Sequence, residues 1–385
     1  MYNDVTAMLR AFVHGEKPVF ANDFDEKEFL KCAYYQNILG IVAYMNRRYR
    51  FLSDSVFSAL ENTYYSVVSD SVVRQEAFSK LSARLSEEGI EHMPVKGLYI
   101  MEYYAVKELR SFGDIDILIR ESDRAKTDKL MRELGYDIKT DWEPTYSYLK
   151  GNEFYEIHSN LFDVRLKNRP DMIEYFSKAW DYAEKRNGLC FEPQRDFHFI
   201  YIICHIAKHL STSGAGIRMF LDVAFFIEKF NSEMSWDYIK DEFKKLKLEK
   251  FLYTVLSAVE DWFGVTADCD FEKLSENELN ELLAYTLGAD IYGHNRDNTL
   301  VKLRTQKSPS KALLLIKMIF PPKSQIENRY TFLEKSSLLL PLAWVVRFFK
   351  NIKLIPSWIK SVGNLKTADS DGVEKVDDFM KKIGL

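Results

Sequence analysis

The sequence has little cysteine, no long hydrophobic run and no strong excess of charge of either sign. Its four cysteines are scattered without close pairing, which argues against a disulfide framework and a cysteine-based zinc site and suits a reducing cytoplasm. The longest apolar run, Leu338 to Val346, is interrupted by Pro341 and is far shorter than the roughly 20 residues that span a bilayer. The formal net charge is -4, so the chain lacks the global basic field that favours tight, non-specific binding to nucleic acid.

The start of the chain also lacks a targeting pattern. Residues Met1 to Val5 contain no basic region followed by an apolar run, so we expect no secretory signal and predict a cytoplasmic protein. With 385 residues, of which 46% are hydrophobic, the chain is long enough for two or three domains with a sizeable core.

One short stretch carries a strong chemical signal. From Asp114 to Ile119 polar and apolar residues alternate, and three isoleucines contribute to the pattern, which predicts a strand that enters a core. Asp114 and Asp116 then share one face about 6.6 Å apart along the strand, near enough to hold the same divalent cation or a close pair of cations. The alternative is an exposed strand edge with two solvated aspartates. We interpret the pair as a Mg²⁺ site that handles nucleotide phosphates.

The surroundings of this stretch predict a small sheet between helical regions. Helical spacing of apolar residues dominates up to Gly89 and again after Pro170, whereas the region between them favours short strands and turns. Ile90 to Gly97 is expected to form a first strand, and Leu98 to Val106 a helix. The glycine lets the backbone approach a phosphate closely.

A further strand is predicted from Glu153 to His158. Its alternation places Glu156 and His158 on one side, so that a third carboxylate becomes available. Glu156 is a candidate metal ligand or base for an acceptor hydroxyl, with Asp163 as a rival and a plain surface glutamate as the alternative. His158 is a candidate to contact the nucleotide or orient Glu156, although a structural histidine is an equal alternative.

Two cations lie beside predicted turns at the mouth of the same sheet. Lys96 and Arg110 are candidates to neutralise triphosphate charge, because arginine grips phosphate oxygens bidentately and lysine acts as a mobile point charge. Each could instead be a surface cation. Gly97 completes the proposed phosphate-binding turn.

Taken together, these motifs resemble a bacterial family of poorly characterised nucleotidyltransferases within the DNA polymerase beta-like nucleotidyltransferase superfamily. The resemblance spans about residues 85 to 347 and rests on segments that occur in order: Val95-Lys96-Gly97, Arg110, Gly113 to Ile119, Tyr155 to His158, His205 to His209 with Arg218 and Asp222, Ile319 to Pro321, and Leu339 to Trp344 with Arg347. It implies an α+β fold, with a small mixed sheet flanked by N-terminal and C-terminal helical regions. It also implies two Mg²⁺ (or Mn²⁺) ions held by Asp114, Asp116 and Glu156. The usual Gly-Ser or Gly-Gly phosphate turn of the superfamily is replaced here by Lys96-Gly97.

This interpretation predicts a magnesium-dependent enzyme that transfers a nucleoside monophosphate from a nucleoside triphosphate, such as ATP, to an acceptor hydroxyl. The acceptor stays open among a small molecule, a sugar, an RNA end and a protein. One alternative is a glycosyltransferase that uses a nucleotide-sugar, although its Asp-x-Asp normally follows a doubly wound βα unit. Another is an inactive nucleotide-binding scaffold, which the three intact carboxylates argue against.

The predicted domains are a helical region at 1–89, a nucleotidyltransferase core at 90–168, a helical domain at 169–365, and a linker with a short amphipathic helix at 366–385. On one predicted helix, His205, Lys208 and His209 share a face. We expect that face to line the cleft or to form a buried polar network with Arg218 and Asp222, because a zinc site lacks an obvious third ligand.

The aromatic and basic residues around Trp344 are expected to pack in the core, with a solvated basic face, so peripheral membrane contact is not expected.

Overall fold

The computed structural model describes residues 2–142, 145–162, 169–212, 214–288, 320–326, 332–350 and 370–385. Asp163, which the sequence offered as a rival to Glu156, and residues 366–369 of the predicted linker lie outside this part of the chain. All structural statements below refer to the described residues.

The strands of the described residues form one mixed sheet in the order β3-β4-β5-β2-β1-β7-β6. They are β1 (His92–Val95), β2 (Ile115–Ile119), β3 (Asp137–Trp142), β4 (Thr145–Lys150), β5 (Glu153–His158), β6 (Ala183–Asn187) and β7 (Cys190–Pro193). The central strand β2 pairs antiparallel with β1 and parallel with β5, and β4 and β5 form an antiparallel hairpin. The predicted α+β class with a mixed sheet is confirmed.

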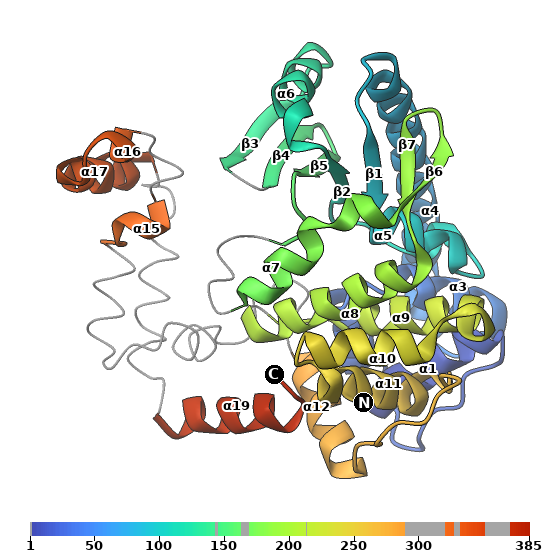
Figure 1. The fold of residues 1–385 in the computed structure, drawn as a ribbon. Helices are drawn as coiled ribbons and strands as arrows, with labels where there is room; N and C mark the ends of the chain where they lie inside the picture. Colours follow the sequence, from blue (N-terminus) through green and yellow to red (C-terminus); the bar gives the residue numbers. More distant parts are fainter. Residues whose placement is uncertain are drawn as a thin grey trace.

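Helices precede and follow the sheet, and many of them stack below it in the view of Figure 1. The N-terminal helices are α1 (Tyr2–His14), α2 (Glu26–Tyr35), α3 (Leu39–Tyr49) and α4 (Asp54–Glu87). Within the sheet region lies α6 (Arg124–Glu133). Helix α7 (Pro170–Ser177) lies between β5 and β6. The helices after β7 are α8 (Arg195–Thr212), α9 (Ile217–Phe230), α10 (Trp236–Lys245), α11 (Glu249–Phe263) and α12 (Glu276–Gly288).

Two hydrophobic cores cover the two faces of the sheet. One unites helices from both ends of the chain, with Phe12 of α1, Ile203 of α8 and Val255 of α11 in a single cluster. The other joins the C-terminal half of α4 and helix α6 to the isoleucines of β2. Burial of this apolar area supplies most of the stabilisation of both parts, at about 25 cal/mol per Å².

One local prediction was wrong. The helix expected from Leu98 to Val106 is replaced by the short helix α5 (Gly97–Ile100) and the 3₁₀ turn η1 (Met101–Tyr103), and a second 3₁₀ turn, η2 (Lys107–Leu109), follows that segment. The region after Pro170, which was predicted to be mainly helical, also contains β6 and β7, and these strands extend the sheet through the pairing of Cys190 with His92.

The chain ends in α19 (Ser370–Lys382), which lies beside α12 in Figure 1. Phe379, Met380 and Ile383 are buried in the helical core, and the Thr254 hydroxyl donates to the Ile383 carbonyl over 3.1 Å. The final helix therefore docks on the body. Farther upstream lies α17 (Leu340–Lys350), which exposes Leu342 to solvent. None of the described helices is both long and apolar enough to cross a bilayer.

Candidate active site

The acidic face of β2 is turned toward the helical body. Ile115, Ile117 and Ile119 pack into the core with α4 and α6, whereas Leu118 belongs to the core of the helical body. Because successive side chains of a strand point to opposite faces, Asp116 shares the face of Leu118. Asp114 directly precedes the strand, and both aspartates line one cavity of about 470 Å³.

The parallel pairing of β2 with β5 brings the other acidic group to this face. Asp116 is directly opposite Glu156, and Leu118 is opposite His158. Asp116, Glu156 and His158 each offer a ligand atom, and these atoms all lie within 4.8 Å of one another. Asp114 lines the same cavity beside this group. The convergence of Glu156 with the aspartates, on which the sequence interpretation depended, is present.

A histidine links the ligands. The His158 Nε2 atom lies 2.8 Å from Asp116 Oδ1 and 3.8 Å from Glu156 Oε2. Its Nδ1 atom contacts the Thr145 hydroxyl at 3.1 Å, which fixes the orientation of the ring. The hydrogen bond of His158 is therefore with Asp116 and not with Glu156, the residue that it was predicted to orient.

The charges of this group favour a cation. Burial, followed by the nearby Asp116, raises the pKa of both Glu156 and Asp114. Burial alone would also raise the pKa of Asp116, but the ammonium of Lys96 and the imidazole of His158 outweigh it and lower the pKa. Several acidic groups held together away from water are costly unless a cation compensates them. The donor set of carboxylate and imidazole therefore fits a divalent metal such as Mg²⁺ or Mn²⁺.

Lys96 reaches this group from the end of β1. Its Nζ atom lies 2.6 Å from Asp116 Oδ1, and both side chains are largely buried. The backbone of Lys96 has φ 57° and ψ −123°, a combination that residues other than glycine rarely adopt. This strained conformation occurs at the residue directly before Gly97, and the lysine side chain lines the cavity.

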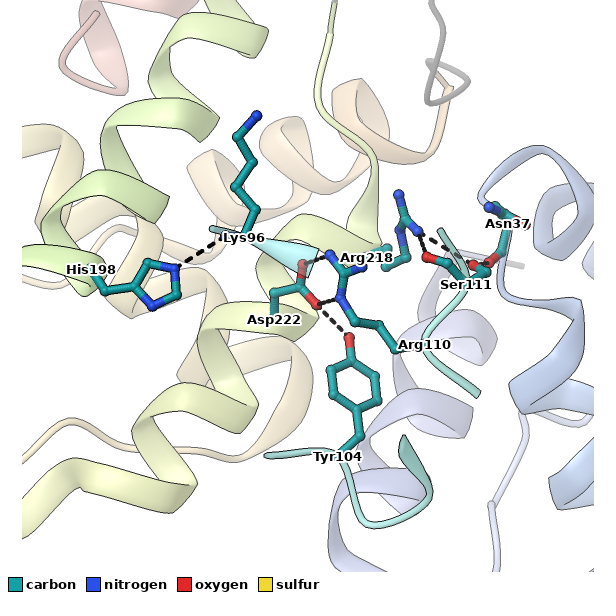
Figure 2. Close-up of polar contacts among 8 residues, drawn as sticks. All are labelled: Asn37, Lys96, Tyr104, Arg110, Ser111, His198, Arg218 and Asp222. Atoms are coloured by element: carbon teal, nitrogen blue, oxygen red, sulfur yellow. Dashed lines mark hydrogen bonds and ion pairs between the residues drawn. The ribbon is translucent and has the colours of Figure 1, made fainter. Parts of the chain in front are cut away.

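The Arg110 side chain passes close to Gly97 and is held in place by Asp222. A Cβ atom at position 97 would lie 2.8 Å from the Arg110 Cζ atom, so the glycine is needed for this close approach. The guanidinium donates to both carboxylate oxygens of Asp222 in α9, with Nε–Oδ1 at 3.0 Å and Nη2–Oδ2 at 2.7 Å. Figure 2 shows the Tyr104 hydroxyl reaching the same carboxylate, over 2.7 Å.

The helical wall of the cavity comes from α8 and α9. It includes His205, Lys208 and His209, together with Arg218 and Asp222, which confirms that this face lines the cleft. Burial, followed by the charge of Lys96, lowers the pKa of His205 well below its usual range. Burial and Lys208 lower that of His209 to about 3. Both imidazoles are therefore neutral at physiological pH.

Two supporting residues were missed in the sequence. Tyr104 lies in the segment read as a helix, and no local pattern connects it with Asp222. His198 accepts a hydrogen bond at Nε2 from the backbone amide of Lys96 over 3.3 Å (Figure 2). His198 is seven residues before His205, so both lie on one face of α8. This spacing could have identified His198 as a residue of the site.

Comparison with known proteins decides the family. A family model described as "Uncharacterised nucleotidyltransferase" matches residues 22–264. The chain belongs to this family. No curated protein and no solved structure matches the chain. Every residue that lines the cavity falls within the matched range, so the nucleotidyltransferase family model covers both walls of the site and supports a general role in nucleotidyl transfer.

Proposed function

We propose that the protein transfers a nucleoside monophosphate from a nucleoside triphosphate to an acceptor hydroxyl and releases pyrophosphate. The observation that carries this proposal is the convergence of Asp116, Glu156 and His158 on one wall of a cavity that Asp114 also lines. Family membership supports the reaction class. A mixed sheet whose central strands are β1, β2 and β5 also differs from the doubly wound unit that a nucleotide-sugar enzyme would require.

In this proposal Asp114, Asp116 and Glu156 hold divalent metal, and His158 is an additional donor. The metal would neutralise phosphate charge and favour the alkoxide form of the acceptor. The acceptor oxygen forms a bond to the α-phosphorus while the bond from that phosphorus to the pyrophosphate oxygen breaks. Glu156 accepts the hydroxyl proton, a role supported by its raised pKa.

The phosphate side of the proposal uses Lys96, Gly97 and Arg110. Lys96 can move from Asp116 toward phosphate oxygens, because its long side chain carries a mobile point charge. Arg110 lines the cavity, but two of its N–H groups are engaged by Asp222. We therefore assign Arg110 a positioning role beside Gly97, with its remaining Nη1 group available to the nucleotide.

A labelling experiment tests the reaction class. The protein is incubated with Mg²⁺, cell extract and a nucleoside triphosphate labelled at either the α- or the γ-phosphate. Transfer of the α label to an acceptor, with the γ label released as pyrophosphate, is expected. Transfer of the γ label would contradict the proposal.

Variants connect that activity to the site. Asp116→Asn and Glu156→Gln are expected to lose at least about 10²-fold in rate, as loss of a group used in the transition state does. Glu153→Gln is the matched control, because Glu153 is on the same strand but points away from Glu156 and bonds with Tyr136. Equal labelling by wild type and Asp116→Asn would exclude the assigned site.

A further inference from the structure

The cavity has two walls of opposite charge. The sheet wall contributes Asp114, Asp116 and Glu156, and the helical wall contributes Lys208 and Arg218. Two further ion pairs, Lys96 with Asp116 and Arg110 with Asp222, bridge neighbouring elements. A ligand that satisfies both walls must therefore present cations on one side and anions on the other.

Arg218 lines this cavity and forms no ion pair with the described residues. Its Nη1 group donates to the backbone carbonyl and the hydroxyl of Ser111, which are neutral acceptors. No carboxylate in the described part of the chain forms an ion pair with it, and its buried Nε atom has no partner there. Figure 2 shows the guanidinium directed at Ser111 and separate from the Asp222 carboxylate, which Arg110 occupies.

Such an arrangement is unfavourable without an anion. Burial lowers the pKa of Arg218, and the adjacent Arg110 lowers it further. Arg218 is half-buried, and a partly desolvated charge without an ion-pair partner is unfavourable until an anion binds to it. Arginine matches phosphate well because its planar fork can donate two parallel hydrogen bonds.

We infer that Arg218 forms an anion subsite for the β- and γ-phosphates of the nucleoside triphosphate, and thus for the departing pyrophosphate. This inference rests on the proposed function and names the residue that grips the leaving group. The assignment to the polyphosphate follows from charge. The cavity lining contains four cationic and four carboxylate side chains, namely Lys96, Arg110, Lys208 and Arg218 with Asp114, Asp116, Glu156 and Asp222. Since these charges balance, metal bound at the acidic wall calls for a polyanion at the basic wall.

The subsite also has a defined support. Ser111, which accepts from Arg218, donates its own hydroxyl to the Asn37 carbonyl over 2.9 Å. The loop from Arg110 to Asp114 is thereby fixed between α9 and the turn after α2. Phosphate bound at Arg218 would be held on the same loop that ends in the acidic pair.

Binding measurements with small anions test the inference. Inorganic pyrophosphate and a nucleoside 5′-monophosphate are titrated into the protein by calorimetry in the presence of Mn²⁺. Arg218→Gln is expected to weaken pyrophosphate binding by about tenfold or more, since loss of a charged hydrogen bond costs at least that much. Binding of the monophosphate is expected to change by less than about twofold, because its phosphate would occupy the metal side. Arg218→Lys is expected to be intermediate, because it keeps the charge and loses the fork.

Controls separate the possible failures. Arg132→Gln removes one exposed cation outside the cavity and is expected to leave pyrophosphate binding unchanged. Mn²⁺ binding, followed by electron paramagnetic resonance, is expected to be the same in Arg218→Gln and wild type. If Arg218→Gln keeps wild-type affinity for pyrophosphate, or loses Mn²⁺ as well, the anion subsite is refuted while the proposed function stands. If the wild-type protein binds neither nucleoside triphosphate nor pyrophosphate, the proposed function itself fails.

Discussion

The ion pair between Arg110 and Asp222 is the clearest test of how the helical body holds the site. Its side chains are 7% and 7% exposed, and the pair is bidentate. Asp222→Asn keeps the shape of the side chain but leaves the buried guanidinium without a counter-charge. Breaking a buried pair by removing one partner costs about 3–5 kcal/mol, a large part of the roughly 5–15 kcal/mol that stabilises a typical domain.

The measurement is the free energy of unfolding from denaturant titration of wild type and Asp222→Asn. The exposed pair of Lys129 and Glu133, with 78% and 54% exposure, provides the control: Glu133→Gln is expected to cost less than about 1 kcal/mol. The double variant Arg110→Met/Asp222→Leu removes both charges, so its cost is expected to be lower than the sum of the single changes.

A decrease of less than about 1 kcal/mol in the free energy of unfolding of Asp222→Asn would refute the reasoning, because a buried guanidinium without its counter-charge destabilises the folded state by more than that. Additive effects in the double variant would also show that the two residues do not act as a pair.

Three further predictions concern neighbouring contacts. Lys96→Met is expected to bind Mn²⁺ about tenfold more tightly without nucleotide, because an ammonium 2.6 Å from Asp116 Oδ1 competes with metal; weaker binding in a titration would contradict this. Gly97→Ala is expected to destabilise the protein by about 1–3 kcal/mol, because the new methyl group displaces the Arg110 guanidinium, and denaturant unfolding measures it. Burial lowers the pKa of His198 to about 3. Because its pKa is about 6.5 when unfolded, stability is lost as pH falls, by about 1.4 kcal/mol per unit below 6.5; in His198→Gln this slope is expected to be smaller, and an unchanged slope would exclude His198 as its source.

The acidic wall could be predicted because its information is local. Alternation along β2 and β5 places Asp116 and Glu156 on one face of each strand, and the two strands need only pair in register to bring them together. The bulky residues of the opposite face, such as Ile117 and Tyr155, are buried in the core with α4 and α6. A one-residue slip would move them out of this core to the face that carries Asp116 and Glu156, so the hydrophobic pattern also fixes the register.

The rest of the sheet carries no comparable signal. Strand β6 is mainly exposed along its length, so it lacks the alternation of buried and solvated positions that identifies a strand. Strand β7 has four residues and ends in Pro193. These strands join the sheet through β1, which the local sequence cannot reveal.

The role of Arg110 could not be read from its position beside a turn. The residue that engages it, Asp222, is 112 positions away and belongs to a helix whose apolar periodicity gives no information about partners. The same holds for Lys96, whose side chain contacts the acidic wall because of an unusual backbone conformation. Spacing identified both cations as residues near the site, but only tertiary structure shows which charges compensate them.

The division of the cavity between sheet and helices explains why the family match extends so far beyond the acidic strand. The acidic wall alone would need only the strands, yet Arg218 and Asp222 come from α9, and α9 packs against α11 through Phe220 and Trp262. The matched range ends at residue 264, directly after α11. The matched range therefore includes both walls of the cavity and helix α11, whereas α1, α12 and α19 lie outside it and contribute no residue to the cavity.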